Sequence, residues 1–144
     1  LRCGSVRVQF IKHERVAEAA TIWMNTPRGV LTVSSVEATL LELVGFQHYS
    51  GGLDNVATVA VELAEMADAE KLADAARRVP LPWAQRLGYI LELVGAEKLA
   101  APLKRYVGES AKKYVPLLTG GLKDVSARSG DWRLFLNSTI EAEL

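Results

Sequence analysis

Residues 82–95 read PWAQRLGYILELVG, and they contain the strongest periodic pattern in the chain. The large apolar side chains recur every three or four residues, which is the spacing of one buried face of an α-helix. These side chains are Trp83, Leu87, Ile90, Leu91 and Val94. Pro82 suits the first turn of a helix and Gly95 is a typical C-terminal stop. The stretch therefore predicts a helix that packs one face into the core.

Helices are predicted on both sides of this one. Ser34 and Glu37 have the spacing of a capping box ahead of an apolar helical pattern that reaches about residue 45. Residue 54 or 55 can cap a second helix, and Asp68 can cap a short third one. A last helix is predicted over about residues 99–107, and Pro102 inside it predicts a kink or two short pieces.

Strands are predicted before and after the helices. Apolar and polar side chains alternate over residues 6–10, which is typical of a half-buried strand. Residues 21–33 combine β-branched and aromatic residues with a central turn and predict a β-hairpin. Residues 114–118 predict an edge segment because they include a proline. Residues 132–136 alternate again and predict a closing strand that pairs with the early strands.

The predicted order of elements defines the fold class. Strands come first, four or five helices follow, and one or two strands close the chain, so we predict an α+β fold. Its parts are N-terminal strands with a β-hairpin, a central four-to-five-helix bundle and the closing C-terminal strand or strands. The 144 residues, 49% of them hydrophobic, suffice for one core, so residues 1–144 are expected to form a single domain.

Composition excludes several classes of protein. One cysteine, Cys3, excludes a disulfide framework and a cysteine-only zinc site. The 17 basic and 17 acidic residues give no net charge, which excludes a generically basic nucleic-acid-binding protein. The sequence contains no secretory leader and no run of about 20 apolar residues. We therefore expect a cytoplasmic protein without a membrane partner.

The zero net charge hides an uneven distribution. Residues 1–72 contain six basic and nine acidic side chains, whereas residues 73–144 contain eleven and eight. Clustered bases can bind DNA or an acidic partner, although they can equally be the solvated faces of helices. The candidate basic patch consists of Arg77, Arg78, Lys98, Lys104, Arg105, Lys112 and Lys113.

Motifs for catalysis, cofactors and metals are missing from the sequence. His13 and His48 lie 35 positions apart, and neither stands at a close metal-ligand spacing from the other or from Cys3. No nucleophile elbow and no glycine-rich phosphate loop is present. We predict no catalytic, cofactor-binding or metal-ligating residue.

Several residues of the chain are predicted to serve the fold. Gly88, inside the strongest helix, suggests close packing of a neighbouring element. Arg86 is interpreted as a structural arginine paired with a carboxylate rather than as a ligand-binding residue. The three tryptophans are expected in the core rather than as platforms for stacked bases. They are Trp23, Trp83 and Trp132.

Three stretches of the chain stand out together. They are GVLTVSSVEATLLELV at residues 29–44, QRLGYILE at residues 85–92 and WRLFLN at residues 132–137. In this order, and with the Gly51-Gly52 loop between the first two, they resemble motifs of the AbiEi-type antitoxins, the abortive-infection regulators of type IV toxin–antitoxin systems. Two positions depart from the family pattern: Val36, where many members have Pro, and Glu42, where Asp is usual. Neither departure changes the helix prediction.

The resemblance implies a function that the residues alone do not. Such antitoxins carry an N-terminal winged helix-turn-helix domain that binds their own promoter, and a C-terminal domain linked to neutralising a nucleotidyltransferase-like toxin. No helix-turn-helix is predicted before residue 34 and the chain begins without Met, so we expect the C-terminal domain alone. The toxin would carry Gly-Ser followed by D-x-D, whereas this chain has Gly4-Ser5 and no Asp-x-Asp. In some family members the C-terminal domain presents a positive face to DNA, and the resemblance makes the candidate basic patch the best candidate for such a face here.

Two functional hypotheses follow. The first is a non-catalytic antitoxin that neutralises a nucleotidyltransferase-like toxin, directly or indirectly, and contributes to promoter binding and autoregulation. The second is a small-ligand sensor or an enzyme domain with an unrecognised site. The second predicts a deep pocket in which several titratable groups converge.

Overall fold

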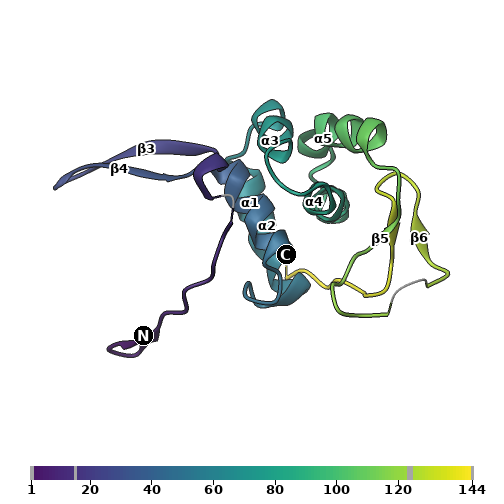
Figure 1. The fold of residues 1–144 in the computed structure, drawn as a ribbon, viewed down its shortest axis with the longest axis horizontal. Helices are drawn as coiled ribbons and strands as arrows, with labels where there is room; N and C mark the ends of the chain where they lie inside the picture. Colours follow the sequence, from purple (N-terminus) through teal and green to yellow (C-terminus); the bar gives the residue numbers. More distant parts are fainter. Residues whose placement is uncertain (1, 15, 123–124, 144) are drawn as a thin grey trace.

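The computed structural model describes residues 2–14, 16–122 and 125–143, with side chains from residue 4 onward. Its helices are α1 Val36–Gly45, α2 Gly52–Ala64, α3 Ala69–Ala76, α4 Leu81–Leu93 and α5 Glu97–Ser110. Its strands are β1 Arg2–Cys3, β2 Val6–Arg7, β3 Thr21–Thr26, β4 Gly29–Ser34, β5 Val115–Pro116, β6 Arg128–Ser129 and β7 Leu134–Phe135, and a short 3-10 helix covers Val16–Glu18. The predicted α+β class is confirmed. The hairpin lies at one end of the helical body and the C-terminal strands lie at the other (Figure 1).

The helix predicted most strongly is the centre of the core. Helix α4 packs against α1, α2, α3 and α5, and Leu87, Ile90 and Leu91 on its apolar stripe are fully buried. Full burial of one such side chain stabilises the fold by about 1.5–3 kcal/mol. Gly95 has a φ of +83° and ends this segment in the left-handed conformation, as predicted.

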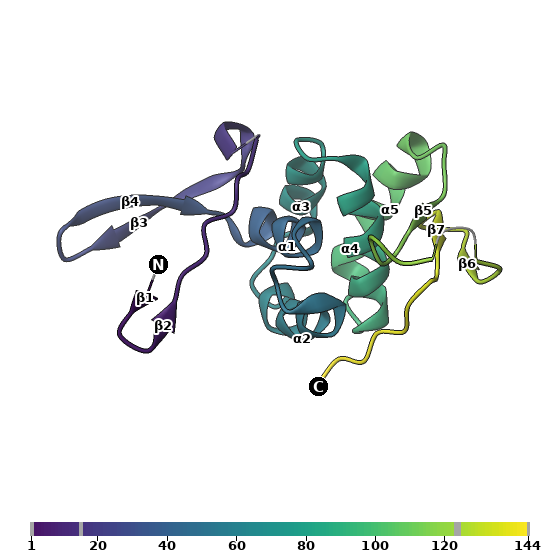
Figure 2. The ribbon, with the colours of Figure 1, turned by 60° about the horizontal axis from the view of Figure 1, so that its bottom comes forward.

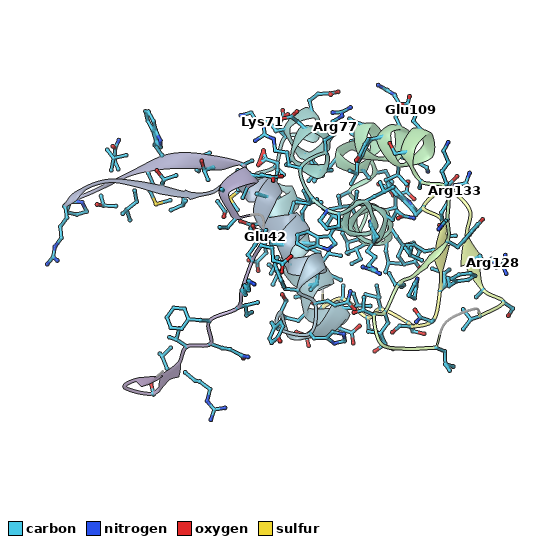
Figure 3. All side chains as sticks on the ribbon, in the orientation of Figure 1. Glu42, Lys71, Arg77, Glu109, Arg128 and Arg133 are labelled. Carbon is cyan, nitrogen blue, oxygen red and sulfur yellow. The ribbon has the colours of Figure 1, made fainter. Side chains whose placement is uncertain are left out.

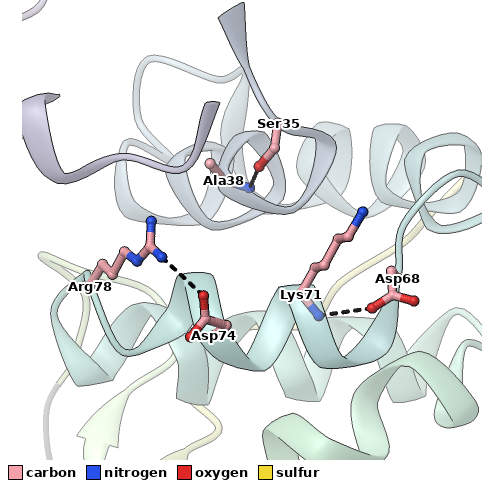
Figure 4. A network of polar contacts seen from close by, with 6 residues as sticks. All are labelled: Ser35, Ala38, Asp68, Lys71, Asp74 and Arg78. Carbon is pink, nitrogen blue, oxygen red and sulfur yellow. Dashed lines mark hydrogen bonds and ion pairs between the residues drawn. The ribbon is translucent and has the colours of Figure 1, made fainter. Parts of the chain in front are cut away.

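The cap of α1 differs by one residue from the prediction. Ser35, not Ser34, is the N-cap, and its Oγ accepts a hydrogen bond from the Ala38 N–H at 3.1 Å (Figure 4). Glu37 does not close a capping box. Its Oε1 accepts a hydrogen bond from the Asp68 N–H at 3.4 Å and so links α1 to the start of α3.

The starts of α2 and α3 show one wrong and one correct prediction. Helix α2 begins at Gly52 without a side-chain cap, so neither Asp54 nor Asn55 caps it. Asp54 instead accepts a hydrogen bond from the Glu141 N–H at 2.9 Å and holds the C-terminal tail on α2. Asp68 caps α3 as predicted, because its Oδ1 accepts from the Lys71 N–H at 2.9 Å (Figure 4).

Pro102 does not divide α5, which runs as one helix from Glu97 to Ser110 (Figure 1). The prediction of two short pieces was therefore wrong. The proline removes one backbone hydrogen bond, but Leu99, Leu103 and Val107 bury the helix on both sides of it. Packing of this apolar face outweighs the loss.

The hairpin over residues 21–33 is confirmed. Strands β3 and β4 pair in register from Thr21 opposite Ser34 to Thr26 opposite Gly29. They form a two-stranded sheet to which no other described strand is added, and the hairpin projects away from the helices (Figure 2). Trp23 is 82% exposed, so its predicted place in the core was wrong.

The early strand predicted over residues 6–10 is mostly absent. Only Val6 and Arg7 are in a strand, which pairs with β1, and Phe10 is 80% exposed. Alternation gives a segment one apolar face, but that face is buried only where another layer covers it. In the described residues no sheet or helix covers this face.

The closing strand belongs to a separate C-terminal sheet with the order β5-β7-β6, in which β7 runs parallel to β5 and antiparallel to β6. The predicted pairing with the early strands was wrong, because the helical body separates the two groups (Figure 2). The edge position of the proline-containing segment is confirmed, since β5 is an outer strand. Trp132 and Leu134 are buried, as their alternation predicts.

Candidate interaction surfaces and the buried polar network

Two side chains of the QRLGYILE motif form hydrogen bonds with backbone carbonyls in the segment that follows α5. Gln85 is buried on α4, and its Nε2 donates to the carbonyls of Trp132 and Arg133, at 3.1 Å each, and approaches that of Lys113 at 3.5 Å. Arg86 is also buried, and its Nε donates to the Pro116 carbonyl at 2.9 Å. The prediction of a structural arginine is confirmed, but its partner is a backbone carbonyl rather than a carboxylate. Burial lowers the pKa of the Arg86 guanidinium.

Gly88 is the point at which Trp132 packs onto α4. A Cβ built on Gly88 would overlap the six-membered ring of Trp132, so the predicted close approach is confirmed. The indole Nε1 of Trp132 donates to Glu92 Oε2 at 2.9 Å, one turn further along α4. Glu92 Oε1 accepts from Lys104 Nζ at 2.7 Å, and Lys104 also pairs with Asp131 at 3.2 Å. These contacts join α4, α5 and the closing segment.

Asn137, the last residue of the WRLFLN motif, closes the C-terminal loop. Its Oδ1 accepts from the Leu118 N–H at 2.8 Å, and its Nδ2 donates to the carbonyls of Leu118 and Leu122 at 2.9 and 2.7 Å. Just after α1, Gln47 accepts a hydrogen bond from the Thr119 N–H at 3.2 Å. The residue pattern contained no signal for Gln47, because an isolated polar residue after a helix is usually solvated.

The N-terminal arm is attached to the helical body by His13. Its Nε2 lies 3.3 Å from Glu42 Oε1 on α1, and its ring packs at centroid distances of 5.5 Å from Phe46 and 6.0 Å from Trp83. Trp83 in turn covers Gly45, where an added Cβ would overlap its indole. Nothing in the residue pattern placed His13 in an aromatic cluster.

Lys104 gives the domain a pH-dependent contribution to stability. Its hydrogen bonds with Glu92 and then Asp131 raise its pKa above the ordinary 10.5. A raised folded-state pKa stabilises the fold at pH values below the unfolded pKa, and this stabilisation is lost as the pH rises through the folded pKa.

We therefore expect Lys104→Met to lower the melting temperature at neutral pH by a few degrees at most, because 39% of the side chain is exposed and water screens the pair. The difference in melting temperature between Lys104→Met and the unsubstituted chain should narrow as the pH rises above 10.5. Differential scanning calorimetry of both proteins, from neutral pH to above pH 10.5, measures this difference. A difference that stays constant through alkaline pH would contradict the charge-based account.

The candidate basic residues divide into two neutralised and five unpaired side chains. Arg78 pairs with Asp74 at 3.0 Å (Figure 4), and Lys104 is engaged as described. Within the described residues the other five form no ion pair. They are Arg77, Lys98, Arg105, Lys112 and Lys113.

The five unpaired bases lie in two places. Lys98 and Arg105 are seven residues apart on α5 and therefore share its outward face. Arg77 follows the end of α3 (Figure 3), and its guanidinium carbon lies over the ring of Tyr106 of α5, 5.2 Å from the ring centroid. Lys112 and Lys113 instead line a separate surface hollow beside the start of α4. The seven predicted residues therefore do not form one unbroken patch, and we call Arg77, Lys98 and Arg105 the α5 basic face.

One cavity gathers several titratable groups. It has a volume of about 540 Å³ and lies where the hairpin joins the helices, lined by Glu37, Glu70, Lys71 and Asp74 among others. Glu37 and Asp74 already have the partners Asp68 and Arg78. We call this space the root cavity. No group of three or more His, Cys, Asp or Glu side chains in the described part of the chain is arranged to hold a metal ion.

The motif residues thus stabilise the fold: the side-chain amides of Gln85 and Asn137, the guanidinium of Arg86 and the indole of Trp132 form hydrogen bonds that hold the C-terminal segment in place. Over residues 1–93 the chain matches the family model described as the AbiEi antitoxin C-terminal domain, and it belongs to that family. The first two motif stretches lie inside the matched region, and the closing WRLFLN stretch lies beyond it. No curated protein and no solved structure matches the chain.

Family membership gives the chain the role of an antitoxin in a toxin–antitoxin system linked to abortive infection. None of the helices in the described ranges is both long enough and apolar enough to cross a membrane.

Proposed function

We propose that the chain is a non-catalytic antitoxin of a type IV system, which counteracts a nucleotidyltransferase-like toxin through binding surfaces rather than through a reaction of its own. The family match over residues 1–93 is the observation on which this proposal depends. The engagement of Gln85, Arg86 and Asn137 with backbone groups supports it. These side chains of the motifs hold the fold, so the surfaces are left to perform recognition.

Co-expression tests the neutralisation. A nucleotidyltransferase-like toxin from a related operon is induced in cells that contain either this chain or an empty vector. We expect growth to recover only with the chain, and purification through a tagged toxin then distinguishes direct contact from indirect action. Arrested growth despite normal soluble amounts of the chain would refute the neutralising role.

We further propose that the α5 basic face contributes to promoter binding, since Lys98 and Arg105 are exposed and unpaired within the described residues. Glu109, one turn after Arg105 on the same helix (Figure 3), limits the net positive charge of this face. Contacts to phosphates release counterions, so the affinity should fall steeply with salt concentration. The contribution is therefore expected to be modest and local.

Reversing the charges of Lys98 and Arg105 tests this face. We expect Lys98→Glu with Arg105→Glu to weaken binding to the operon's promoter about tenfold and to reduce the salt slope by about two, one for each lost phosphate contact. Fluorescence anisotropy at several salt concentrations measures both quantities. The matched control is Arg7→Glu with Arg28→Glu, which changes the net charge equally at two exposed bases outside the helices. Equal loss in both variants would show a general charge effect and would remove the α5 basic face from the proposal.

Arg78 and Lys104 are excluded from this test. Reversing them would place like charges beside Asp74, Glu92 and Asp131, so the substitutions would also lower the stability of the fold, modestly because the pairs are partly exposed. Any loss of DNA binding would then have two causes.

A further inference from the structure

The C-terminal tail lies on α2 and is held there by two backbone hydrogen bonds. Asp54 Oδ1 accepts from the Glu141 N–H at 2.9 Å, and Thr58 Oγ1 accepts from the Glu143 N–H at 3.0 Å. Residues 139–143 contain neither helix nor turn, and the tail lies beside α2 in both ribbon views (Figures 1 and 2). Helix α2 therefore holds an extended segment by its alternate backbone amides.

The spacing of the two acceptors matches that of an extended chain. Asp54 and Thr58 are four residues apart on α2, which corresponds to about 6 Å along a helix axis. Two residues of an extended chain span roughly 6.6 Å, so every second amide can meet one acceptor. The same row of α2 continues at Glu62, which is exposed and forms no ion pair within the described residues. The row therefore has room for a longer segment than the tail.

The side chains of the tail alternate in the same way as its amides. Ile140 and Ala142 are partly buried and pack against the core, whereas Glu141 and Glu143 are exposed. The hydrogen bonds use only the backbone, so any residue except proline can supply them. This face of α2 thus selects apolar residues at alternate positions and leaves the intervening side chains in solvent.

The charges of the tail and of α2 are not complementary. The hollow beside the tail has a volume of about 490 Å³, and its lining includes the carboxylates of Asp54, Glu141 and Glu143 and no basic side chain of the described residues. The only charged residues of α2 are Asp54 and Glu62. Like charges repel, so a segment with Lys or Arg at the positions of Glu141 and Glu143 would suit α2 better than the tail does.

We propose that this face of α2 is a binding groove for a basic, extended protein segment, and that the C-terminal tail occupies the groove until such a segment displaces it. Two hydrogen bonds and the apolar contacts of two side chains hold the tail, so it belongs to the part of the fold that opens most readily. The incoming segment supplies the same backbone amides and replaces the repelling carboxylates with cations. This groove is separate from the α5 basic face.

Fluorescence anisotropy of labelled peptides, titrated with the full chain, tests the proposal. The basic peptide copies residues 138–143 with Glu141→Lys and Glu143→Lys, and the acidic peptide keeps both glutamates. We expect the basic peptide to bind with a dissociation constant below about 1 mM, and about tenfold more tightly than the acidic one. A third peptide has the two lysine backbone amides of the basic peptide methylated. It keeps the charge but has no donor at these positions, and it should bind about tenfold more weakly.

Variants of the chain separate the groove from its occupant. Glu141→Pro with Glu143→Pro removes both donors of the tail, so in this released chain the groove is open more often and should bind the basic peptide about tenfold more tightly. Thr139→Pro is the matched control, because no acceptor for its N–H is found among the described residues, and it should leave the affinity unchanged. Asp54→Ala with Thr58→Val, made in the released chain, removes both acceptors and should cancel the gain in affinity.

Hydrogen exchange of the Glu141 and Glu143 amides in the unsubstituted chain reports the displacement directly. We expect their protection to fall when the basic peptide is added. The proposal is overturned if the basic peptide does not bind the released chain, if the methylated peptide binds as tightly as the basic one, or if both amides stay protected while the peptide is bound. Equal affinities of the acidic and basic peptides would reject a basic segment as the partner.

Discussion

Gly88→Ala is expected to destabilise the domain by about 3 kcal/mol, at the upper end of typical overpacking effects. The new Cβ would occupy the position of the Trp132 ring, which is buried and cannot move without leaving its hydrogen bond to Glu92. The ring attaches the closing segment to α4, together with the hydrogen bonds from Gln85. The expected loss therefore includes the attachment of that segment as well as local crowding. Urea unfolding measures the change in the free energy of unfolding. An unchanged m-value shows that only the stability has changed.

Gly108→Ala is the matched control for this substitution. Gly108 is also inside a helix, α5, but apart from its chain neighbours and the backbone of its own helix no described atom lies within 4 Å of the position of its added Cβ. Alanine has the higher helix propensity, so this variant should gain up to about 1 kcal/mol of stability. If both alanine variants gained stability, the close packing of Trp132 on α4 would be refuted.

Gln85 should show the second large effect. Gln85→Leu removes the buried donor that serves the carbonyls of Trp132 and Arg133, and we expect a loss of about 2 kcal/mol. Gln85→Glu keeps the shape of the side chain but turns a carboxylate towards these carbonyls, and the loss should reach about 4 kcal/mol at neutral pH. A stability that decreases from the unsubstituted chain to Gln85→Leu and again to Gln85→Glu is expected if Gln85 acts as a hydrogen-bond donor.

Acidification separates the two Gln85 variants. The introduced carboxyl group of Gln85→Glu can donate one hydrogen bond once it is protonated, so the stability of this variant relative to Gln85→Leu should recover as the pH falls. Thermal unfolding of both variants over a series of acidic pH values measures this recovery. Gln9→Leu, the same change on the exposed N-terminal arm, should alter stability by less than about 0.5 kcal/mol. If Gln85→Glu were as stable as the unsubstituted chain at neutral pH, the side chain would serve only to fill space.

The helical part of the fold could be predicted from sequence because its patterns are local. The stripe of Leu87, Ile90 and Leu91 repeats at helical spacing, and Asp68 satisfies backbone donors within its own turn. Such signals need no knowledge of distant residues. The cap at Ser35 was missed by one position because Ser34 and Ser35 offer the same chemistry, and only the backbone geometry distinguishes them.

Placement of the strands could not be predicted, because it depends on which layers face each other. Val6 and Trp132 belong to segments predicted as strands from alternation, and Trp23 to one predicted from its β-branched and aromatic residues, yet of the three only Trp132 is buried. Trp132 is buried because its ring packs against α4 at Gly88, where no side chain occupies the space. Within the described residues no further sheet layer covers the hairpin.

The sequence predicted the candidate basic patch only from the number of basic residues, without showing which of them are paired with carboxylates. Arg78 and Lys104 were grouped with Lys98 and Arg105, but the first two are neutralised by carboxylates on the same or neighbouring elements. Asp74 is one turn from Arg78 and could have given a signal. Glu92 and Asp131 are 12 and 27 positions from Lys104 and could not.

The central claim is that the motif residues maintain the fold while surfaces recognise the partners. Growth rescue from a co-expressed toxin by Gln85→Leu, at a temperature where circular dichroism shows the variant to be folded, tests this claim most directly. We predict full rescue there and a loss of rescue only as the variant unfolds on warming. A folded Gln85→Leu variant that accumulates normally and fails to rescue growth would contradict it.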